Sequence, residues 1–320
     1  SGKRGGKFMT DIFKCTDAGS EYCPCELAGT LNCISCSLLQ GKDTCDCGWN
    51  GVCILNEYYM SNKKIKEGRK TYNAQKVYCK DMGNNSFILK IEVQDELVKE
   101  LKRPGSYVFI RPEDKKTYFD VPMSILDVED DKFIYIAYQN TGCKTKSLNN
   151  VDRFLIRGPY WNGVIGTVNF NKLINTNCLV ISKGIGQSSI VLPIKTMKKN
   201  GNNIVLFLDK GKLNRTYIFD FIDKEDVELY QGHIFESKNR IRRIIEEENI
   251  ELIFSAGSDL VHKFIYELIK EFNTDIKFVT TNNNRFCCGE GVCGACINRA
   301  KSGYKVRMCK AQVNPKIFYI

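Results

Sequence analysis

The chain has 320 residues, of which 43% are hydrophobic, and its 47 lysines and arginines against 37 aspartates and glutamates give a formal net charge of +10. This length predicts two or three domains, and the apolar content is ample for packed cores. No apolar run has the length of a membrane span, and no charged-then-apolar leader opens the sequence, so we expect neither a membrane anchor nor a signal peptide.

The basic excess does not predict a nucleic-acid-binding protein. Lysine is spread thinly along the chain, and no element combines clustered basic residues with aromatic ones. Three of the positive charges lie in residues 1–8, which we interpret as an expression scar ahead of Met9. The remaining charge is compatible with a basic face that docks an acidic redox partner.

Cysteine is the extreme feature of the composition, with 16 residues. A secreted disulfide scaffold is short and cysteine-rich throughout, whereas this chain has long cysteine-poor stretches with ordinary patterning. We therefore expect a cytoplasmic protein that uses its cysteines for metal ligation.

The first predicted module, residues 9–71, is rich in cysteine. Its eight cysteines leave little apolar material for a core, so metal must hold the segment together. Two [4Fe–4S] clusters, one larger cluster or two zinc ions would each use eight thiolates, and we favour iron–sulfur because a redox motif occurs elsewhere in the chain. The candidate ligands are Cys15, Cys23, Cys25, Cys33, Cys36, Cys45, Cys47 and Cys53. Residues 56–72 are rich in lysine and asparagine and predict a linker.

The second module, residues 72–163, has the alternation of β-strands. Six short apolar stretches with turn signals between them predict a small antiparallel barrel. We expect these strands at residues 76–80, 86–93, 106–111, 125–128, 133–138 and 153–157.

The third module, residues 164–281, alternates strands and helices and therefore predicts a parallel sheet. Strands are expected at residues 178–182, 203–208, 251–255 and 277–281, and helices at 190–199, 241–249 and 259–272. A G-x-G turn at Gly184 and Gly186 follows the first of these strands, where a pyrophosphate would meet the start of a helix. A plain tight turn explains the two glycines equally well.

The last segment, residues 282–320, carries the spacing C-x4-C-x2-C-x12-C at Cys288, Cys293, Cys296 and Cys309. The first three cysteines have the plant-type spacing for a [2Fe–2S] cluster. Intervening glycines would let the backbone curl around the inorganic sulfides. Zinc is the alternative, but a zinc knuckle usually has two separated CxxC pairs. We take Cys287 as a bystander, because its use as a ligand would lengthen the first spacing.

We therefore predict an α+β multidomain protein with a Cys-rich metal module, an antiparallel barrel, an α/β parallel-sheet domain and a [2Fe–2S] segment. This order of parts over residues 72–312 resembles the ferredoxin–NADP reductase superfamily. Within it, the chain looks most like the electron-transfer subunit of dihydroorotate dehydrogenase and the related sulfide dehydrogenase-like flavoproteins. The Cys-rich front end has no counterpart in the simple electron-transfer subunit.

The resemblance implies that the barrel binds FAD and that the parallel sheet binds NAD(P)H. The family's R-P-x-S signature corresponds to residues 121–124, its following strand end to 137–139, and its phosphate-binding Gly-Thr to 144–145. The connector between the two domains corresponds to residues 158–163, and the approach to the cluster to 282–288. The implied cofactor-binding residues are Pro122, Met123, Ser124, Tyr138, Gln139, Lys144, Thr145, Gly184 and Gly186.

Three of the family's cofactor motifs are altered. Asp120 and Val121 stand where the flavin-phosphate arginine is expected, and an aspartate there would repel a pyrophosphate. The glycine-rich turn keeps only its last two glycines, and Ala256-Gly257-Ser258 replaces the Cys-Gly-Pro near the nicotinamide. Lys144 would restore positive charge beside FAD. Lys183 would do so beside a dinucleotide, or it is solvated surface.

The resemblance implies an oxidoreductase, or its electron-transfer subunit, that passes electrons from NAD(P)H through FAD and the [2Fe–2S] cluster to an acceptor. It also implies a redox partner protein or catalytic subunit, and it allows a homo-oligomer. One alternative is a cluster-binding electron carrier that has lost nicotinamide turnover. Another is a zinc-stabilised scaffold or regulatory protein. Hydride transfer needs no side-chain acid or base, so we name no catalytic residue and assign His233 and His262 structural roles.

Overall fold

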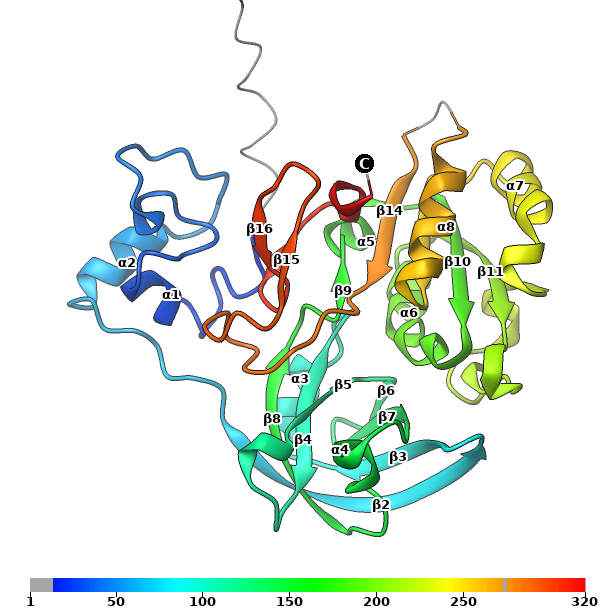
Figure 1. The fold of residues 1–320 in the computed structure, drawn as a ribbon, viewed down its shortest axis with the longest axis horizontal. Helices are drawn as coiled ribbons and strands as arrows, with labels where there is room; N and C mark the ends of the chain where they lie inside the picture. The colour runs from blue at the N-terminus through cyan, green and yellow to red at the C-terminus, as the bar shows by residue number, and fades with distance from the viewer. Residues whose placement is uncertain (1–13, 273–274, 320) are drawn as a thin grey trace, which may run out of the picture. The chain divides into compact units, whose positions relative to one another are not determined.

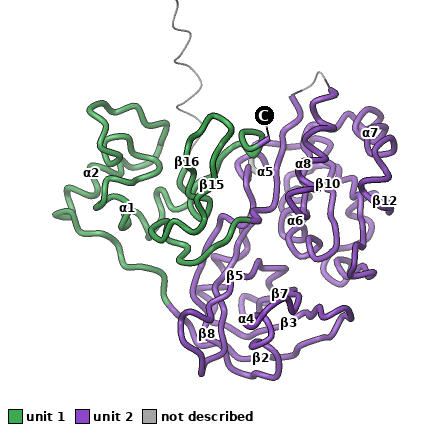
Figure 2. The backbone as a smooth tube through the Cα atoms, viewed as in Figure 1, with its two compact units in different colours: residues 1–70, 284–318 green, residues 71–283, 319–320 purple. Residues whose placement is uncertain are grey.

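The computed structural model describes residues 14–272 and 275–319 (Figure 1). The chain forms two compact units (Figure 2). Unit 1 comprises residues 1–70 and 284–318, and unit 2 comprises residues 71–283 and 319–320. The predicted scar at residues 1–8 lies outside the described residues. In the described part of the chain, no helix is both long and apolar enough to cross a membrane.

Unit 1 joins the Cys-rich module to the C-terminal cysteine segment. Its secondary structure is sparse. Besides short 3₁₀ turns it contains β1 (Lys14–Cys15), α1 (Glu26–Gly29), α2 (Ile54–Met60), β15 (Ile297–Arg299), β16 (Lys305–Arg307) and β17 (Ala311–Gln312). Strand β1 pairs antiparallel with β17, and β15 pairs antiparallel with β16. The two ends of the chain therefore share one small sheet.

Helix α2 corrects the predicted linker at residues 56–72. The helix begins at Ile54, which is 3% exposed and packs in a small core with Cys23, Cys33 and Cys36. Tyr58, one turn later, contacts the same core. Residues four apart lie on one face of a helix, so this face covers the cysteine core. The polar composition of the stretch hid the pattern.

Three buried charged side chains and the partly exposed Glu290 form one network in unit 1. Arg69 Nη2 contacts Asp17 Oδ1 at 2.6 Å, and Arg69 Nη1 contacts Glu290 Oε2 at 2.9 Å. Lys310 Nζ pairs with Asp17 and lies 2.8 Å from Glu290 Oε2. Burial raises the pKa of Asp17, but the charges of Lys310 and Arg69 outweigh this effect and hold the pKa below its usual range. Each acid thus has two basic partners, and the network joins residues from both ends of the chain.

Unit 2 begins with an antiparallel sheet in the order β5-β4-β8-β2-β3-β7-β6. The chain between the two edge strands, β5 and β6, hydrogen-bonds to both sides of the sheet. Ile125 N donates to Ser106 O beside β4, and Leu126 N donates to Tyr135 O in β7, which closes the sheet into a barrel. The elements are β2 (Thr71–Gly83), β3 (Ser86–Glu92), α3 (Asp95–Glu100), β4 (Tyr107–Pro112), β5 (Val121–Ser124), β6 (Asp127–Glu129), β7 (Phe133–Gln139), α4 (Cys143–Lys146) and β8 (Arg153–Tyr160).

The barrel has seven strands where the sequence predicted six. The additional strand is β5, which contains Pro122. Proline cannot donate to a β-ladder and is tolerated at sheet edges, and β5 pairs only with β4 in the sheet. Strand β2 also starts at Thr71, five residues before the predicted start.

The remainder of unit 2 is a six-stranded sheet in the order β12-β11-β10-β13-β14-β9, parallel except for β9. Its elements are β9 (Val164–Ile165), α5 (Val168–Lys172), β10 (Asn177–Lys183), the 3₁₀ helix η3 (Gly184–Ser189), α6 (Val191–Lys199), β11 (Asn203–Asp209), β12 (Glu228–Gln231), α7 (Lys238–Glu247), β13 (Leu252–Ala256), α8 (Asp259–Ile269) and β14 (Lys277–Thr281). The predicted alternation of strands and helices is present, with two edge strands added.

Alternate residues of the central strand β10 enter two different cores. Cys178 and Val180 pack with α6 and with barrel residues such as Ile88. Leu179 and Ile181 pack with α7 and α8. A strand buried on both faces reads as a continuous apolar run, and this explains why the sequence predicted it well. The carboxyl ends of β10, β11 and β13 then lie together at one edge of the sheet.

His262 is buried at this edge, on α8, and is 1% exposed. Its Nδ1 lies 2.8 Å from Ser255 Oγ, and its Nε2 lies 3.0 Å from Thr281 Oγ1 and 3.2 Å from Asn283 Nδ2. Burial disfavours the charged ring and lowers the pKa of His262 to about 4. A neutral histidine therefore connects β13, α8 and β14, which supports the structural role that the sequence predicted.

The His262 pKa predicts an acid-sensitive contribution to stability. The folded pKa lies below the unfolded one, so the contribution is complete above pH 6.5 and is lost as pH falls toward 4, by about 3 kcal/mol in total. We expect His262→Gln to reduce the acid-induced loss of the free energy of unfolding, measured by urea titration between pH 7 and pH 4.

The exposed His233, the only other histidine, provides the matched control. His233→Gln should follow the wild-type pH profile. Parallel loss of stability in the wild type and in His262→Gln would contradict the assignment.

Candidate cofactor sites

The C-terminal cysteines lie on a glycine-rich loop of unit 1. Gly289, Gly291 and Gly294 have φ angles of 76°, 79° and 76°, in the left-handed region that other residues adopt at a cost. These turns curl the backbone between the first three cysteines. The loop buries Cys296, and the following hairpin brings in Cys309, which is 3% exposed.

The four thiols of this segment contact one another. Hydrogen bonding joins Cys309 to Cys288 and to Cys296, and also joins Cys288 to Cys293. The bond with Cys309 lowers the pKa of Cys288 and of Cys296, and the same bonds raise the pKa of Cys309. The predicted set of cysteines therefore converges in space.

Backbone amides also point at these sulfurs. Glu290 N donates to Cys288 Sγ at 3.3 Å, and Cys309 N donates to Cys296 Sγ at 3.4 Å. Such N–H···S bonds are among the features that tune iron–sulfur clusters. Cys287 is exposed.

The N-terminal cysteines fall into two groups. Cys15, Cys23, Cys25 and Cys33 line one small cavity of unit 1, and Cys36 is buried beside it. Burial raises the pKa of Cys23 to about 12 and also raises the pKa of Cys15 and Cys33. The remaining three are exposed or half-buried: Cys45, Cys47 and Cys53. Within residues 14–272 and 275–319, no three His, Cys, Asp or Glu side chains are arranged to hold one metal ion.

The charges around Asp120 correct the argument that this residue repels a pyrophosphate. Asp120 is 8% exposed, and its carboxylate contacts Arg111 Nη1 at 2.5 Å and Arg157 Nη2 at 3.3 Å. Lys144 Nζ donates to the Asp120 carbonyl oxygen at 2.9 Å. Three cations against one anion leave this corner of the barrel positively charged. The arginines come from β4 and β8, outside the motif that the sequence comparison used.

The other residues implied by the flavin motif differ in exposure. Pro122 and Ser124 are half-buried, whereas Met123 and Tyr138 are buried. Tyr138 Oη donates to Asn149 Oδ1 at 2.9 Å, and Gln139 Nε2 donates to Asn84 O at 3.3 Å. Thr145 Oγ1 accepts from the backbone amides of residues 141 and 142 at the start of α4. Tyr138 and Thr145 therefore already have protein partners.

The G-x-G turn makes a close approach at the carboxyl edge of the parallel sheet. A Cβ on Gly186 would lie 2.4 Å from Ala256 O, so only glycine fits there, and Gly184 has a φ of 56°. Lys183 forms an ion pair with Asp209, whose side chain is 2% exposed. Burial raises the pKa of Asp209, but hydrogen bonds from Lys183 and from the backbone amides of residues 234 and 211 outweigh this effect and lower the pKa. Lys183 is therefore half-buried and paired with an aspartate.

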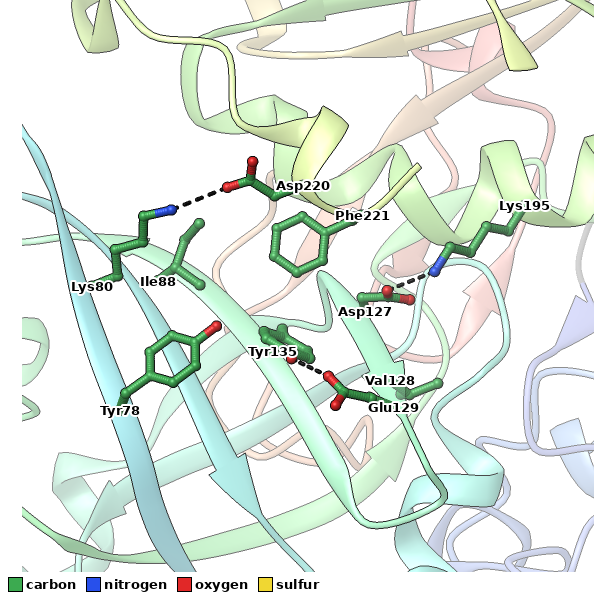
Figure 3. Close-up of a pocket in the computed structure, with 10 residues that line it drawn as sticks. All are labelled: Tyr78, Lys80, Ile88, Asp127, Val128, Glu129, Tyr135, Lys195, Asp220 and Phe221. Atoms are coloured by element: carbon green, nitrogen blue, oxygen red, sulfur yellow. Dashed lines mark hydrogen bonds and ion pairs between the residues drawn. The ribbon is translucent and has the colours of Figure 1, made fainter. Parts of the chain in front are cut away.

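A further pocket, of about 330 Å³, lies between the barrel and α6 (Figure 3). Four of its five charged residues pair with each other: Lys80 with Asp220 at 3.1 Å, and Lys195 with Asp127 at 2.6 Å. The fifth, Glu129, pairs with Lys90 outside the pocket at 2.9 Å. Sequence reasoning missed this pocket because its lining residues come from separate strands and helices and form no local motif. None of the predicted cofactor residues lines it.

No protein-family model matches the chain. It is 24% identical to the dihydroorotate dehydrogenase B (NAD(+)) electron transfer subunit of Clostridium perfringens over 200 residues, which covers 61% of this chain and 78% of that protein. It is also 24% identical, over 250 residues, to the Aquifex aeolicus homolog of this subunit, with coverage of 74% and 93%.

Among solved structures, an NADH-dependent reduced ferredoxin–NADP oxidoreductase studied for flavin-based electron bifurcation aligns with a TM-score of 0.59 and 20% identity. The alignment covers 76% of this chain and 92% of the other. At this identity the structural match shows the fold alone. The sequence matches are a separate line of evidence. Together they confirm the predicted resemblance: the chain has the fold of the ferredoxin–NADP reductase superfamily and resembles the dihydroorotate dehydrogenase electron transfer subunits in sequence.

Proposed function

We propose that this chain is an iron–sulfur flavoprotein that transfers electrons between NAD(P)H and an acceptor through FAD and a [2Fe–2S] cluster. The observation that carries the proposal is the convergence of Cys288, Cys293, Cys296 and Cys309 on a chain with a reductase fold. The relatives named as electron transfer subunits support a role as an oxidoreductase or as its electron-transfer subunit.

The C-terminal segment fits a [2Fe–2S] cluster by its donor set. Four thiols meet there, and two backbone amides donate to their sulfurs. A [2Fe–2S] cluster places two thiolates on each iron, so it does not need three ligands around one point. The cluster would supply one-electron chemistry, while the loop glycines and the amides hold the sulfurs in position.

The corner of the barrel around Asp120 fits the phosphates of FAD. Lys144 is exposed, and two arginines neutralise the aspartate beside it. FAD would supply the exchange between a hydride and single electrons. The protein residues would bind and orient it, with Lys144 and Arg157 offering charge-assisted hydrogen bonds to the pyrophosphate.

The edge of the parallel sheet fits NAD(P)H less completely. Gly184 and Gly186 keep the close turn that brings backbone amides toward a pyrophosphate. Lys183, however, is already paired with Asp209. A redox partner or catalytic subunit would then accept the electrons, as the similarity to electron transfer subunits suggests.

The pairing of Lys183 favours one second candidate, an electron carrier that has lost nicotinamide turnover. Anaerobic addition of NADH or NADPH to the purified chain separates the two. Bleaching of the flavin band near neutral pH supports the reductase. A flavin-containing or flavin-free protein that only dithionite reduces supports the carrier.

The first prediction from this proposal concerns the cluster ligands. We expect Cys293→Ser to lower iron and acid-labile sulfide by about two per chain, or to shift the visible spectrum, because serine is a poorer ligand for iron. The adjacent bystander gives a matched control: Cys287→Ser should keep wild-type iron, sulfide and absorbance. An unchanged spectrum in Cys293→Ser would refute the assignment.

The second prediction concerns FAD. Lys144→Gln removes one charge-assisted hydrogen bond, so we expect FAD affinity to fall roughly ten- to a hundredfold. Titration of the deflavinated protein, followed by flavin fluorescence, measures this. Lys146→Gln changes an exposed lysine on the same short helix and should bind FAD like the wild type. Equal affinity of the Lys144→Gln and wild-type proteins would contradict the role of Lys144.

A further inference from the structure

Four of the eight N-terminal cysteines surround a single cavity in unit 1, and the other four do not. We propose that Cys15, Cys23, Cys25 and Cys33 bind one [4Fe–4S]-class cluster that exchanges electrons with the C-terminal cluster. This inference rests on the proposed function, because it takes the C-terminal [2Fe–2S] cluster as the redox partner.

The arrangement of the cavity selects these four residues. Cys23 and Cys33 are 7% and 9% exposed, and Cys15 and Cys25 are half-buried beside them. Cys45 and Cys53 are exposed and do not line the cavity. Cys36 does not line it either, but its backbone amide donates to Cys33 Sγ at 3.4 Å. Cys36 therefore positions a ligand through its backbone, which a serine would also do.

The walls of the cavity favour a cluster over zinc. Besides the cysteines, the cavity is lined mostly by apolar residues and by one acid: Leu27, Ala28, Ile34, Ile54, Pro24 and Asp17. The four cysteines have the spacing C-x7-C-x-C-x7-C, without the two CxxC pairs of a common structural zinc site. In a [4Fe–4S] cluster each thiolate binds a different iron, so ligands spread around an apolar cavity suit it.

The N-terminal cluster would lie next to the C-terminal [2Fe–2S] cluster. Cys15 is the strand partner of Ala311, and Ala311 follows Cys309 by two residues. Paired antiparallel residues have Cα atoms about 5 Å apart, so Cys15 and Cys309 are no more than roughly 12 Å apart at Cα. Leu27 also bridges the two: a Cβ on Gly291, in the C-terminal loop, would lie 2.9 Å from Leu27 Cδ1.

Charged residues also link the two cysteine groups. Asp17 lines the cavity and pairs with Lys310, which directly follows Cys309. Glu290, two residues after Cys288, contacts the same lysine. With Arg69, two acids and two bases give this network no net charge.

The exchange between the centres transfers one electron and no atom or proton. A reduced [2Fe–2S] centre is oxidised as the [4Fe–4S] centre is reduced, and reduced flavin supplies the electron in the proposed function. The residues of unit 1 only hold the two centres close, because electron transfer weakens steeply with distance.

The test uses the full chain, purified anaerobically and reduced with dithionite. We expect its electron paramagnetic resonance spectrum to show magnetic coupling between two centres, as a broadened, fast-relaxing [2Fe–2S] signal. Cys25→Ser should lose about four iron atoms per chain and give a narrow, uncoupled [2Fe–2S] signal. Cys36→Ser and Cys45→Ser should keep the coupling, because neither thiol lines the cavity.

The outcomes separate this inference from the proposed function. A wild-type protein with a [2Fe–2S] signal and zinc in the N-terminal module overturns only the inference, as does coupling that survives Cys25→Ser. Loss of coupling in Cys36→Ser with retention in Cys15→Ser would also overturn the ligand set. Absence of any [2Fe–2S] signal overturns both. Mössbauer spectra of ⁵⁷Fe-enriched wild-type protein decide the cluster type even where a variant fails to fold.

Discussion

Unit 1 depends on a charge network in which three of the four side chains are almost fully buried. Asp17, Arg69 and Lys310 have side chains at most 2% exposed, and Glu290 closes the group. Buried charges are costly unless they are fully paired, and removing one partner of such a pair typically costs about 3–5 kcal/mol. Asp17 lies two residues after Cys15, and Lys310 directly follows Cys309. The placement of both cysteine groups therefore follows from the pairing of these charges.

The same compensation appears at two of the three altered motifs, both in unit 2. Asp120 stands where the family has an arginine, but Arg111 and Arg157 turn the corner positive. Lys183 stands where the family has a glycine, but Asp209 neutralises it. The aspartate at 120 makes the flavin motif more negative, and the lysine at 183 makes the glycine-rich turn more positive. The flavin corner keeps a positive field, whereas the cation added at the nucleotide edge is neutralised, and this contrast makes the carrier hypothesis worth separating from the reductase.

Local periodicity allowed much of unit 2 to be predicted, and distant pairing explains what could not be. Strands β10, β11, β13 and β14 are buried apolar runs, so their positions followed from the sequence. Strand β5 contains Pro122 and is stabilised by the pairing with β4, which no local pattern reveals. The spacing of the C-terminal cysteines indicated their convergence. The grouping of the N-terminal cysteines depends on Ile54, on α1 and on contacts with residues near 291 and 310. These residues are distant in sequence, so no local pattern predicts the grouping.

The division into units also constrains how the sites form. Unit 2 is almost one continuous stretch, whereas unit 1 joins residues 1–70 to residues 284–318. The bond between Asp17 and Lys310 spans 293 residues. Closing so long a loop is entropically unfavourable and slow while the intervening chain is unfolded. If residues 71–283 fold first, the loop that remains to be closed becomes shorter. The two halves of unit 1, with the N-terminal and the C-terminal cysteines, would then come together last.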